Sequence, residues 1–253
     1  MIYRRDDLRL LSVCGPDAVA FLDGLISQRT DLALGTGAYA ALLTPQGKLL
    51  ADFPLLRPSE DQLILALPAP LFDATLQKLR LFKLRSQITL SELENQVLHS
   101  ALTPDVLAFA DGRLEDLSHG LAACADRADG DSAAFHAARA ALGVPEGQRD
   151  MIFGKSTLLN EGLACAIDWH KGCYVGQEVT ARMRYRALIK RVLLPYRGPG
   201  QAGQNLEVEG KTVGQVRSTY GDCGFAYVRK EFAGQQVAGL DLGLPIGLKD
   251  LGL

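Results

Sequence analysis

The segment Lys171–Glu178, which reads KGCYVGQE, is the most distinctive stretch of the 253-residue chain. Two glycines bracket its cysteine, so the backbone there can turn tightly or approach a ligand closely. Lys171 carries a positive charge two residues before Cys173, and a helix beginning near Gly176 would bring its N-terminal amides close to the thiol. Both influences favour a thiolate, which is a nucleophile and a soft metal ligand.

The alternative for Cys173 is a buried and inert side chain, because free cysteines are among the most buried residue types. The polar neighbours Lys171, Tyr174 and Gln177 argue against a plain apolar core position, and both interpretations stay open. Cys165 lies inside the apolar run 163–167, and we interpret it as a core residue. Five scattered cysteines without a C-x-x-C pair do not support a disulfide framework or a zinc site built from cysteine pairs.

Composition bounds the class of protein. The chain is 47% apolar with a net charge of -2, which allows a sizeable core and gives no global attraction to nucleic acid or to an anionic membrane. No apolar run reaches the length of a signal peptide core or a membrane-spanning helix. We therefore predict a cytoplasmic protein with no membrane partner.

A basic cluster follows the cysteine segment and has two interpretations. It would suit a polyanion such as RNA or a polyglutamate tail, or it is a solvated face, which is the commoner outcome for a charge run. Tyr185 is the only aromatic residue within the cluster, so direct nucleic-acid binding is not favoured. The four histidines lack metal-site spacing, and the chain has no P-loop and no G-x-S-x-G motif. The cluster consists of Arg182, Arg184, Arg186, Lys190 and Arg191.

Hydrophobic periodicity predicts alternating strands and helices over the first 190 residues. Thr44–Gly47 has turn composition and predicts a hairpin, 111–133 predicts irregular surface, and 143–147 predicts a turn. The strands are expected at 8–13, 38–43, 48–56, 62–67 and 86–90, and the helices at 15–26, 70–83, 132–142 and 177–188.

The pattern changes after residue 189, where short apolar runs are separated by glycines. This spacing predicts a small antiparallel barrel or sandwich, with a boundary near residue 190. The strands are expected at 189–195, 206–208, 211–217 and 224–229.

The segment Lys171–Glu178 resembles the K-G-C-Y-x-G-Q-E signature of the YgfZ-type folate-binding protein family, which includes mitochondrial iron–sulfur cluster assembly factors. Arg139 with 143–147 is similar to the family's R-x-x-x-G-x-P segment. Other stretches that resemble the family are 15–22, 46–48 with Asp52, 159–161 and 179–182.

The resemblance implies an α+β fold: an aminomethyltransferase-like folate-binding body at 1–190 and a small C-terminal antiparallel β-barrel at 191–253. It also implies weak tetrahydrofolate binding, a transiently shared iron–sulfur cluster, and partners that carry clusters or receive them, including radical enzymes that modify tRNA. Cys173 is the implied catalytic residue and metal ligand. The implied cofactor-binding residues are Phe135, Arg139, Glu161, Lys171, Tyr174, Gln177, Glu178 and Arg182.

Two functions from different classes follow from the resemblance. The first is an accessory factor for the assembly, maintenance or repair of iron–sulfur clusters, acting through Cys173. The alternative is a tetrahydrofolate-dependent aminomethyl transferase, which needs a carboxylate near the reacting folate nitrogen. The related transferases carry adjacent acidic residues where this chain has Ala51-Asp52, and a pterin-binding glutamate where it has Ala141. At two positions that match tryptophans of bacterial members, this chain has Leu8 and Phe135.

Overall fold

The computed structural model describes residues 1–103, 107–186 and 189–246. Its contacts divide the chain into two compact units, and each unit is assembled from separate stretches of sequence. Unit 1 comprises 1–45, 50–135 and 165–175, and unit 2 comprises 46–49, 136–164 and 176–253. The predicted boundary after residue 190 falls at the start of strand β10 and stays a prediction; residues 247–253 of the predicted barrel lie outside the described residues.

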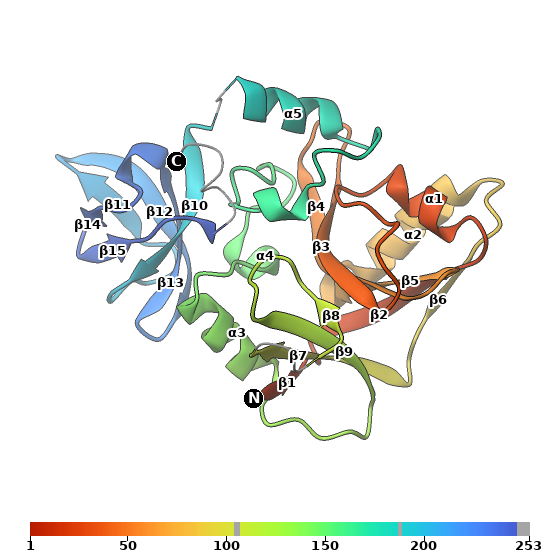
Figure 1. The fold of residues 1–253 in the computed structure, drawn as a ribbon. Helices are drawn as coiled ribbons and strands as arrows, with labels where there is room; N and C mark the ends of the chain where they lie inside the picture. Colours follow the sequence, from red (N-terminus) through yellow and green to blue (C-terminus); the bar gives the residue numbers. More distant parts are fainter. Residues whose placement is uncertain (104–106, 187–188, 247–253) are drawn as a thin grey trace. The chain divides into compact units, whose positions relative to one another are not determined.

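Unit 1 contains a five-stranded sheet with the order β3-β4-β5-β2-β6 and a four-stranded sheet with the order β1-β7-β9-β8 (Figure 1). The larger sheet consists of β2 Leu8–Cys14, β3 Thr36–Leu43, β4 Leu49–Ser59, β5 Gln62–Pro68 and β6 Thr89–Glu92. The smaller consists of β1 Ile2–Arg4, β7 Gln96–Leu102, β8 Phe109–Ala110 and β9 Leu117–Ala123. The adjacency of β3 and β4 confirms the predicted hairpin around Thr44–Gly47.

The sequence of strand β5 is almost continuously apolar because its side chains are buried on both faces of the larger sheet. Successive side chains of a strand point to opposite faces. Leu63, Leu65 and Leu67 accordingly enter one core cluster, while Ile64 and Ala66 enter a second cluster on the other face. Both faces of the sheet are therefore buried, and each fully buried leucine stabilises the fold by about 1.5–3 kcal/mol relative to an exposed one.

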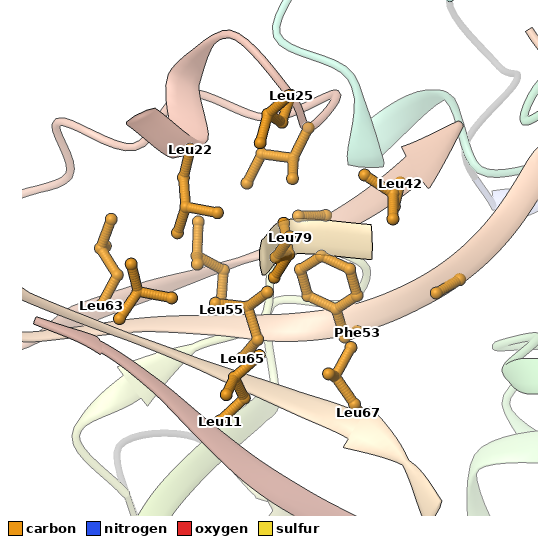
Figure 2. Close-up of a cluster of buried hydrophobic side chains, with 14 of the residues drawn as sticks. Leu11, Leu22, Leu25, Leu42, Phe53, Leu55, Leu63, Leu65, Leu67 and Leu79 are labelled. Carbon is orange, nitrogen blue, oxygen red and sulfur yellow. The ribbon is translucent and has the colours of Figure 1, made fainter. Parts of the chain in front are cut away.

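Two helices complete the first of these clusters. They are α1 Ala18–Asp23 and α2 Phe72–Lys83, the latter preceded by the 3-10 turn η1 Ala69–Leu71. Figure 2 shows Leu22 of α1 and Leu79 of α2 directed toward Leu55, Leu65 and Phe53 of the sheet. The predicted helix at 70–83 is confirmed, whereas the helix expected over 15–26 is confined to six residues.

Unit 2 is dominated by a six-stranded antiparallel sheet with the order β11-β12-β13-β10-β15-β14, coloured blue in Figure 1. Its edge strands β11 and β14 contact each other, so the sheet curls toward closure and has the expected barrel-like form. The strands are β10 Arg191–Arg197, β11 Asn205–Val208, β12 Lys211–Tyr220, β13 Cys223–Arg229, β14 Gln236–Val237 and β15 Leu240–Leu242.

The remaining helices are short. Helix α3 Ser132–Ala141 begins in unit 1 and ends in unit 2, where α4 Gly147–Asp150 and α5 Gln177–Tyr185 follow. Two further 3-10 turns are η2 Ala164–Ala166 and η3 Lys230–Phe232. The helix expected at 177–188 is confirmed as far as Tyr185, and residues 187–188 lie outside the described residues.

The prediction of irregular surface at 111–133 is wrong. Strand β9 lies within this range and is paired on both sides, with β7 and with β8. Asp111, Arg113 and His119 are buried there. Their polar character suggested exposure, but they form hydrogen bonds with one another and so enter the interior with their polar atoms satisfied.

Candidate functional site

Within the segment Lys171–Glu178 the thiol of Cys173 is exposed, whereas the two residues that follow it are buried or packed. Cys173 is exposed, whereas Tyr174 is only 7% exposed and Val175 packs against the core of unit 1. Gly176 then adopts a left-handed conformation with φ 86° as the N-cap of α5, which confirms the predicted helix start. Glycine occupies this conformation at little cost, whereas most residues with a Cβ atom would be strained. The segment therefore presents one accessible thiol from an anchored backbone.

Lys171 anchors this segment on the N-terminal side of Cys173. Its ammonium nitrogen donates hydrogen bonds to the carbonyl oxygens of Asp23 at 2.7 Å, Gln28 at 2.8 Å and Ile26 at 3.0 Å. The nitrogen also lies 3.1 Å from Oδ1 of Asp23, and the Lys171 side chain is 3% exposed. Burial lowers the pKa of Lys171, and the neighbouring Asp23 opposes this shift.

The three carbonyl oxygens around the Lys171 ammonium, here called the carbonyl cage, hold this side chain in one position. Its ammonium group carries three donors, and the three carbonyls together with the Asp23 carboxylate supply acceptors for them. The same ammonium lies 5.3 Å from the centroid of the Tyr174 ring. The predicted effect of Lys171 on the Cys173 thiolate, and its predicted contact with a cofactor, stay predictions.

The other four cysteines differ from Cys173 in environment. Burial raises the pKa of Cys165 to about 11, and burial also raises the pKa of Cys223. Both thiols are therefore protonated and weakly nucleophilic at neutral pH. Cys14 and Cys124 are exposed, as Cys173 is, but they lie at the ends of strands β2 and β9. They are natural comparison residues for Cys173.

Phe135, a predicted cofactor contact, lies in the interior of unit 1. Its side chain is fully buried, with the Arg5 guanidinium 4.3 Å from its ring centroid and Tyr3 packed edge-on at 5.7 Å. The Phe135 ring thus packs against Arg5 and Tyr3 inside unit 1.

Arg139 and Glu161, two further predicted contacts, are buried in unit 2. Arg139 donates to Oδ2 of Asp150 at 2.7 Å and to the carbonyl of Val144 at 2.7 Å. Glu161 accepts hydrogen bonds from the Ser156 hydroxyl and from the backbone amide of Ile152. These contacts stabilise the fold of unit 2.

The last predicted contacts lie on helix α5. Glu178 and Arg182 form an i,i+4 ion pair of 2.6 Å on its exposed surface, and Gln177 is the first residue of the helix. Exposed pairs of this kind stabilise a helix by only about 0.3–0.5 kcal/mol. The Glu178 side chain is 85% exposed, so this face of α5 is open to a partner.

Asp52, the single carboxylate of the strand after the first hairpin, is buried in unit 1. Its Oδ2 atom accepts a hydrogen bond from the Tyr39 hydroxyl. The Arg113 guanidinium stacks over the Tyr39 ring at 3.5 Å. Asp52 therefore belongs to a buried polar region and has Ala51 as its chain neighbour.

Sequence reasoning missed a buried polar chain beside this region. Ser100 Oγ lies 2.8 Å from Nδ1 of His119, whose Nε2 lies 2.7 Å from Oδ2 of Asp111. Arg113 forms a two-pronged ion pair with the same carboxylate, at 2.6 and 2.8 Å. Burial alone would raise the pKa of Asp111, but Arg113 and His119 outweigh it and lower the pKa to about 2. Ser100, His119 and Asp111 are fully buried, so the hydrogen bonds of this serine–histidine–aspartate arrangement stabilise the interior of unit 1.

Comparison with solved structures defines the fold. The chain is similar to the glycine cleavage system aminomethyltransferase T from Bartonella henselae, with a TM-score of 0.79 and 20% identity, over 97% of this chain and 85% of that one. The predicted aminomethyltransferase-like fold is confirmed. At this identity the likeness establishes the architecture alone.

Sequence comparison gives the family. An "Iron-sulfur cluster assembly factor IBA57 homolog, mitochondrial" of Neurospora crassa is 30% identical over 225 residues, which cover 74% of this chain and 51% of that protein. The human "Iron-sulfur cluster assembly factor IBA57, mitochondrial" is 28% identical over 275 residues, covering 90% of this chain and 77% of the relative. No protein-family model matches the chain. The chain belongs to the YgfZ-type family that includes these assembly factors, and it spans about half the length of the first fungal relatives.

The prediction of a cytoplasmic protein is contradicted by these relatives. The fungal, human and mouse proteins are all named as mitochondrial. The missing apolar runs argued only against secretion and membrane insertion, and they do not distinguish one aqueous compartment from another. Among the described residues, none of the helices combines the length and apolar character needed to cross a bilayer.

Proposed function

We propose that the chain is an accessory factor for iron–sulfur cluster assembly, maintenance or repair, and that Cys173 is its working residue. The observation that carries the proposal is the contrast within one segment: an exposed thiol between a caged Lys171 and a buried Tyr174. The names of the relatives support the functional class. An accessible thiol on a fixed backbone suits a residue that contacts first a cluster carrier and then a client protein.

The chemistry of the thiolate explains why a partner is needed. Thiolates are the usual ligands of iron–sulfur clusters, and a cluster is normally held by four of them. Cys173 offers one, so a carrier protein, a client enzyme or a small thiol would supply the others. The cluster is then cargo that is shared briefly. Clients would include radical enzymes that modify tRNA, as the family resemblance implies.

Weak tetrahydrofolate binding by the aminomethyltransferase-like body is a further proposal, and it rests on the fold. Two of the residues expected to hold folate do not fit that role here. The Phe135 ring is covered by Arg5 and Tyr3, and the Arg139 guanidinium is taken up by Asp150 and Val144. No step of the proposed function passes through folate.

The alternative of an aminomethyl transferase gains nothing beyond the shared architecture. General acid–base catalysis needs a carboxylate within hydrogen-bond reach of the reacting atom. Asp52 is buried and accepts a hydrogen bond from Tyr39, and the residue beside it is Ala51. The pair of acidic residues found in the transferases is reduced to one.

The proposal is tested by cluster reconstitution with purified proteins. The wild type alone is expected to hold no stable cluster, and an added cluster-carrier protein is expected to produce a visible absorption and circular dichroism signal. Cys173→Ser should abolish this signal. Cys14→Ser is the matched control, because it removes another exposed thiol of unit 1. An unchanged signal with Cys173→Ser would overturn the proposal.

A further inference from the structure

A basic cleft in unit 2 lies apart in sequence from the cysteine segment. It has a volume of about 400 Å³ and is formed where the ends of β10 and β13 meet the 3-10 turn η3. Among the described residues, four cations and one carboxylate contribute to it. The lining residues are Ile189, Lys190, Arg191, Arg229, Lys230 and Glu231.

The cations are arranged in a way that costs stability. Arg191 and Arg229 are directly opposite each other in the antiparallel pair β10–β13. Lys190 and Lys230 lie just outside the two strands, where the amide of Lys230 donates to the carbonyl of Lys190 at 3.1 Å. Like charges placed directly across a strand pair destabilise the sheet. One such pair with two lysines beside it gives this end of the sheet a local excess of positive charge that does not favour the stability of the fold.

The described part of the chain offers little negative charge to compensate these cations. Glu231 lies 3.6 Å from Arg229, and both side chains are substantially exposed. In the part of the chain that the structure describes, Lys190, Arg191 and Lys230 form no ion pair. The cleft therefore keeps a net positive charge that an incoming anion would neutralise.

The residues that line the cleft bear on whether it binds phosphate groups, nucleic acid or an acidic protein segment. The cleft is lined by long side chains at strand ends, and these differ from the backbone amides of a helix N-terminus or a glycine-rich loop that hold many phosphate groups. Among the residues that the structure describes, no aromatic side chain lines the cleft, so nucleotide bases have no stacking surface there. Four cations also fall below the roughly 6–10 phosphate contacts of a typical nucleic-acid footprint. An exposed basic surface of this size matches the electrostatic part of a protein–protein interface.

We propose that the basic cleft docks an acidic segment of a partner protein, rich in Asp and Glu side chains. The two guanidinium groups can each bind a carboxylate through two parallel hydrogen bonds, and the two ammonium groups add less directional attraction. The segment would bind beside the buried Ile189. This interaction surface is separate from the proposed work of Cys173, and neither idea depends on the other.

The test uses the full chain and a short fluorescent peptide rich in Glu, with its Gln counterpart and a single-stranded RNA of equal length as competitors. Fluorescence anisotropy gives the Kd at low and at physiological salt. Arg191→Glu should weaken binding of the Glu peptide about ten-fold or more. Because the same change places a carboxylate opposite Arg229, it should leave the Tm unchanged or raise it by about 1–3 °C.

Lys155→Glu is the matched control, because it makes the same charge change at an exposed residue of unit 2 outside the cleft. It should leave the Kd within about two-fold of the wild type, as expected of a charge outside the contact. Tighter binding of the RNA that is lost with Arg191→Glu would overturn the proposal in favour of a nucleic-acid site. Equal peptide binding by wild type and Arg191→Glu, or none by the wild type, would also overturn it. Cluster reconstitution through Cys173 can succeed or fail independently of any of these results.

Discussion

The ammonium nitrogen of Lys171 lies 3.1 Å from Oδ1 of Asp23 and 2.7 Å from the carbonyl oxygen of the same residue. This contact joins segments that are 148 positions apart in the chain. It ties the segment that contains Cys173 to the C-terminal end of helix α1. The buried ammonium group of Lys171 therefore anchors the backbone that carries Cys173.

Replacing Lys171 by Met should loosen this connection. The methionine keeps the length and apolar stem of the side chain but removes every donor, so three carbonyls lose their ammonium partner and the Asp23 carboxylate keeps only its hydrogen bonds from Thr30. The free energy of unfolding should fall by about 1–3 kcal/mol in urea titrations. Lys155→Met, at an exposed position, should change it by less than about 0.5 kcal/mol. Equal effects of the two substitutions would contradict the anchoring role.

The five cysteines should separate into two groups by alkylation rate. Cys173, Cys14 and Cys124 are exposed, and we expect all three to react with iodoacetamide at neutral pH, with Cys173 the fastest. With its pKa raised to about 11, Cys165 has a thiolate fraction about a hundred-fold below that of an ordinary cysteine. Mass-spectrometric mapping between pH 7 and pH 10 should show Cys165 reacting only as the pH nears the upper end. Early labelling of Cys165 or Cys223 would contradict the structure.

The buried carboxylate of Asp111 should give unit 1 a specific sensitivity to acid. Its pKa is lowered to about 2, so its contribution to stability is fully present above the ordinary aspartate pKa of 3.8 and is lost as the pH falls toward 2. The wild type should lose stability over this window more steeply than Asp111→Asn. At neutral pH the variant should be less stable by about 3–5 kcal/mol, because Arg113 is left buried without its partner.

Asp31→Asn provides the control for this effect. Asp31 also pairs with an arginine two positions away, at 2.8 Å, but its side chain is 60% exposed. Exposed ion pairs contribute only about 0–1 kcal/mol, so this substitution should shift stability by no more than that. Unfolding followed by circular dichroism at a series of pH values distinguishes the two variants. Parallel acid profiles for wild type and Asp111→Asn would refute the assignment.

The elements that sequence reasoning located best are those with a clear period. Strand β5 and helix α2 were predicted within two residues of their observed ends, because alternation and helical spacing are local properties. The segment Lys171–Glu178 was found through an unusual combination of residue types. These signals need no knowledge of what lies far away in the chain.

The contacts that sequence reasoning missed are long-range and leave no local pattern. The acceptors for Lys171 are mostly backbone carbonyls, which any residue type supplies, so no side chain marks the cage. Asp111, Arg113 and His119 lie in a polar stretch that resembles a surface loop until their pairing is seen. The assembly of each unit from separate stretches of sequence is likewise a property of the tertiary structure.

Arg139 allows structural and ligand-binding roles to be separated. Besides Asp150 and Val144, its guanidinium contacts Nδ1 of His136 at 2.8 Å and the Tyr220 hydroxyl at 3.1 Å. Asp150 in turn accepts hydrogen bonds from Tyr220 at 2.9 Å, and burial raises the pKa of Tyr220 to about 12. The arginine is thus the centre of a buried network within unit 2.

We expect Arg139→Lys to act on stability and not on a ligand. A lysine cannot reproduce the planar fork of donors, so several acceptors lose partners and the free energy of unfolding should fall by about 2–4 kcal/mol. Arg197→Lys, at an exposed strand end, should cost less than about 0.5 kcal/mol. Urea titrations give these values, and calorimetric titration with tetrahydrofolate gives the affinity of the same variants. Folate affinity that falls sharply in Arg139→Lys while stability is preserved would instead establish Arg139 as a folate ligand, because a group engaged only within the fold cannot change binding without changing the fold.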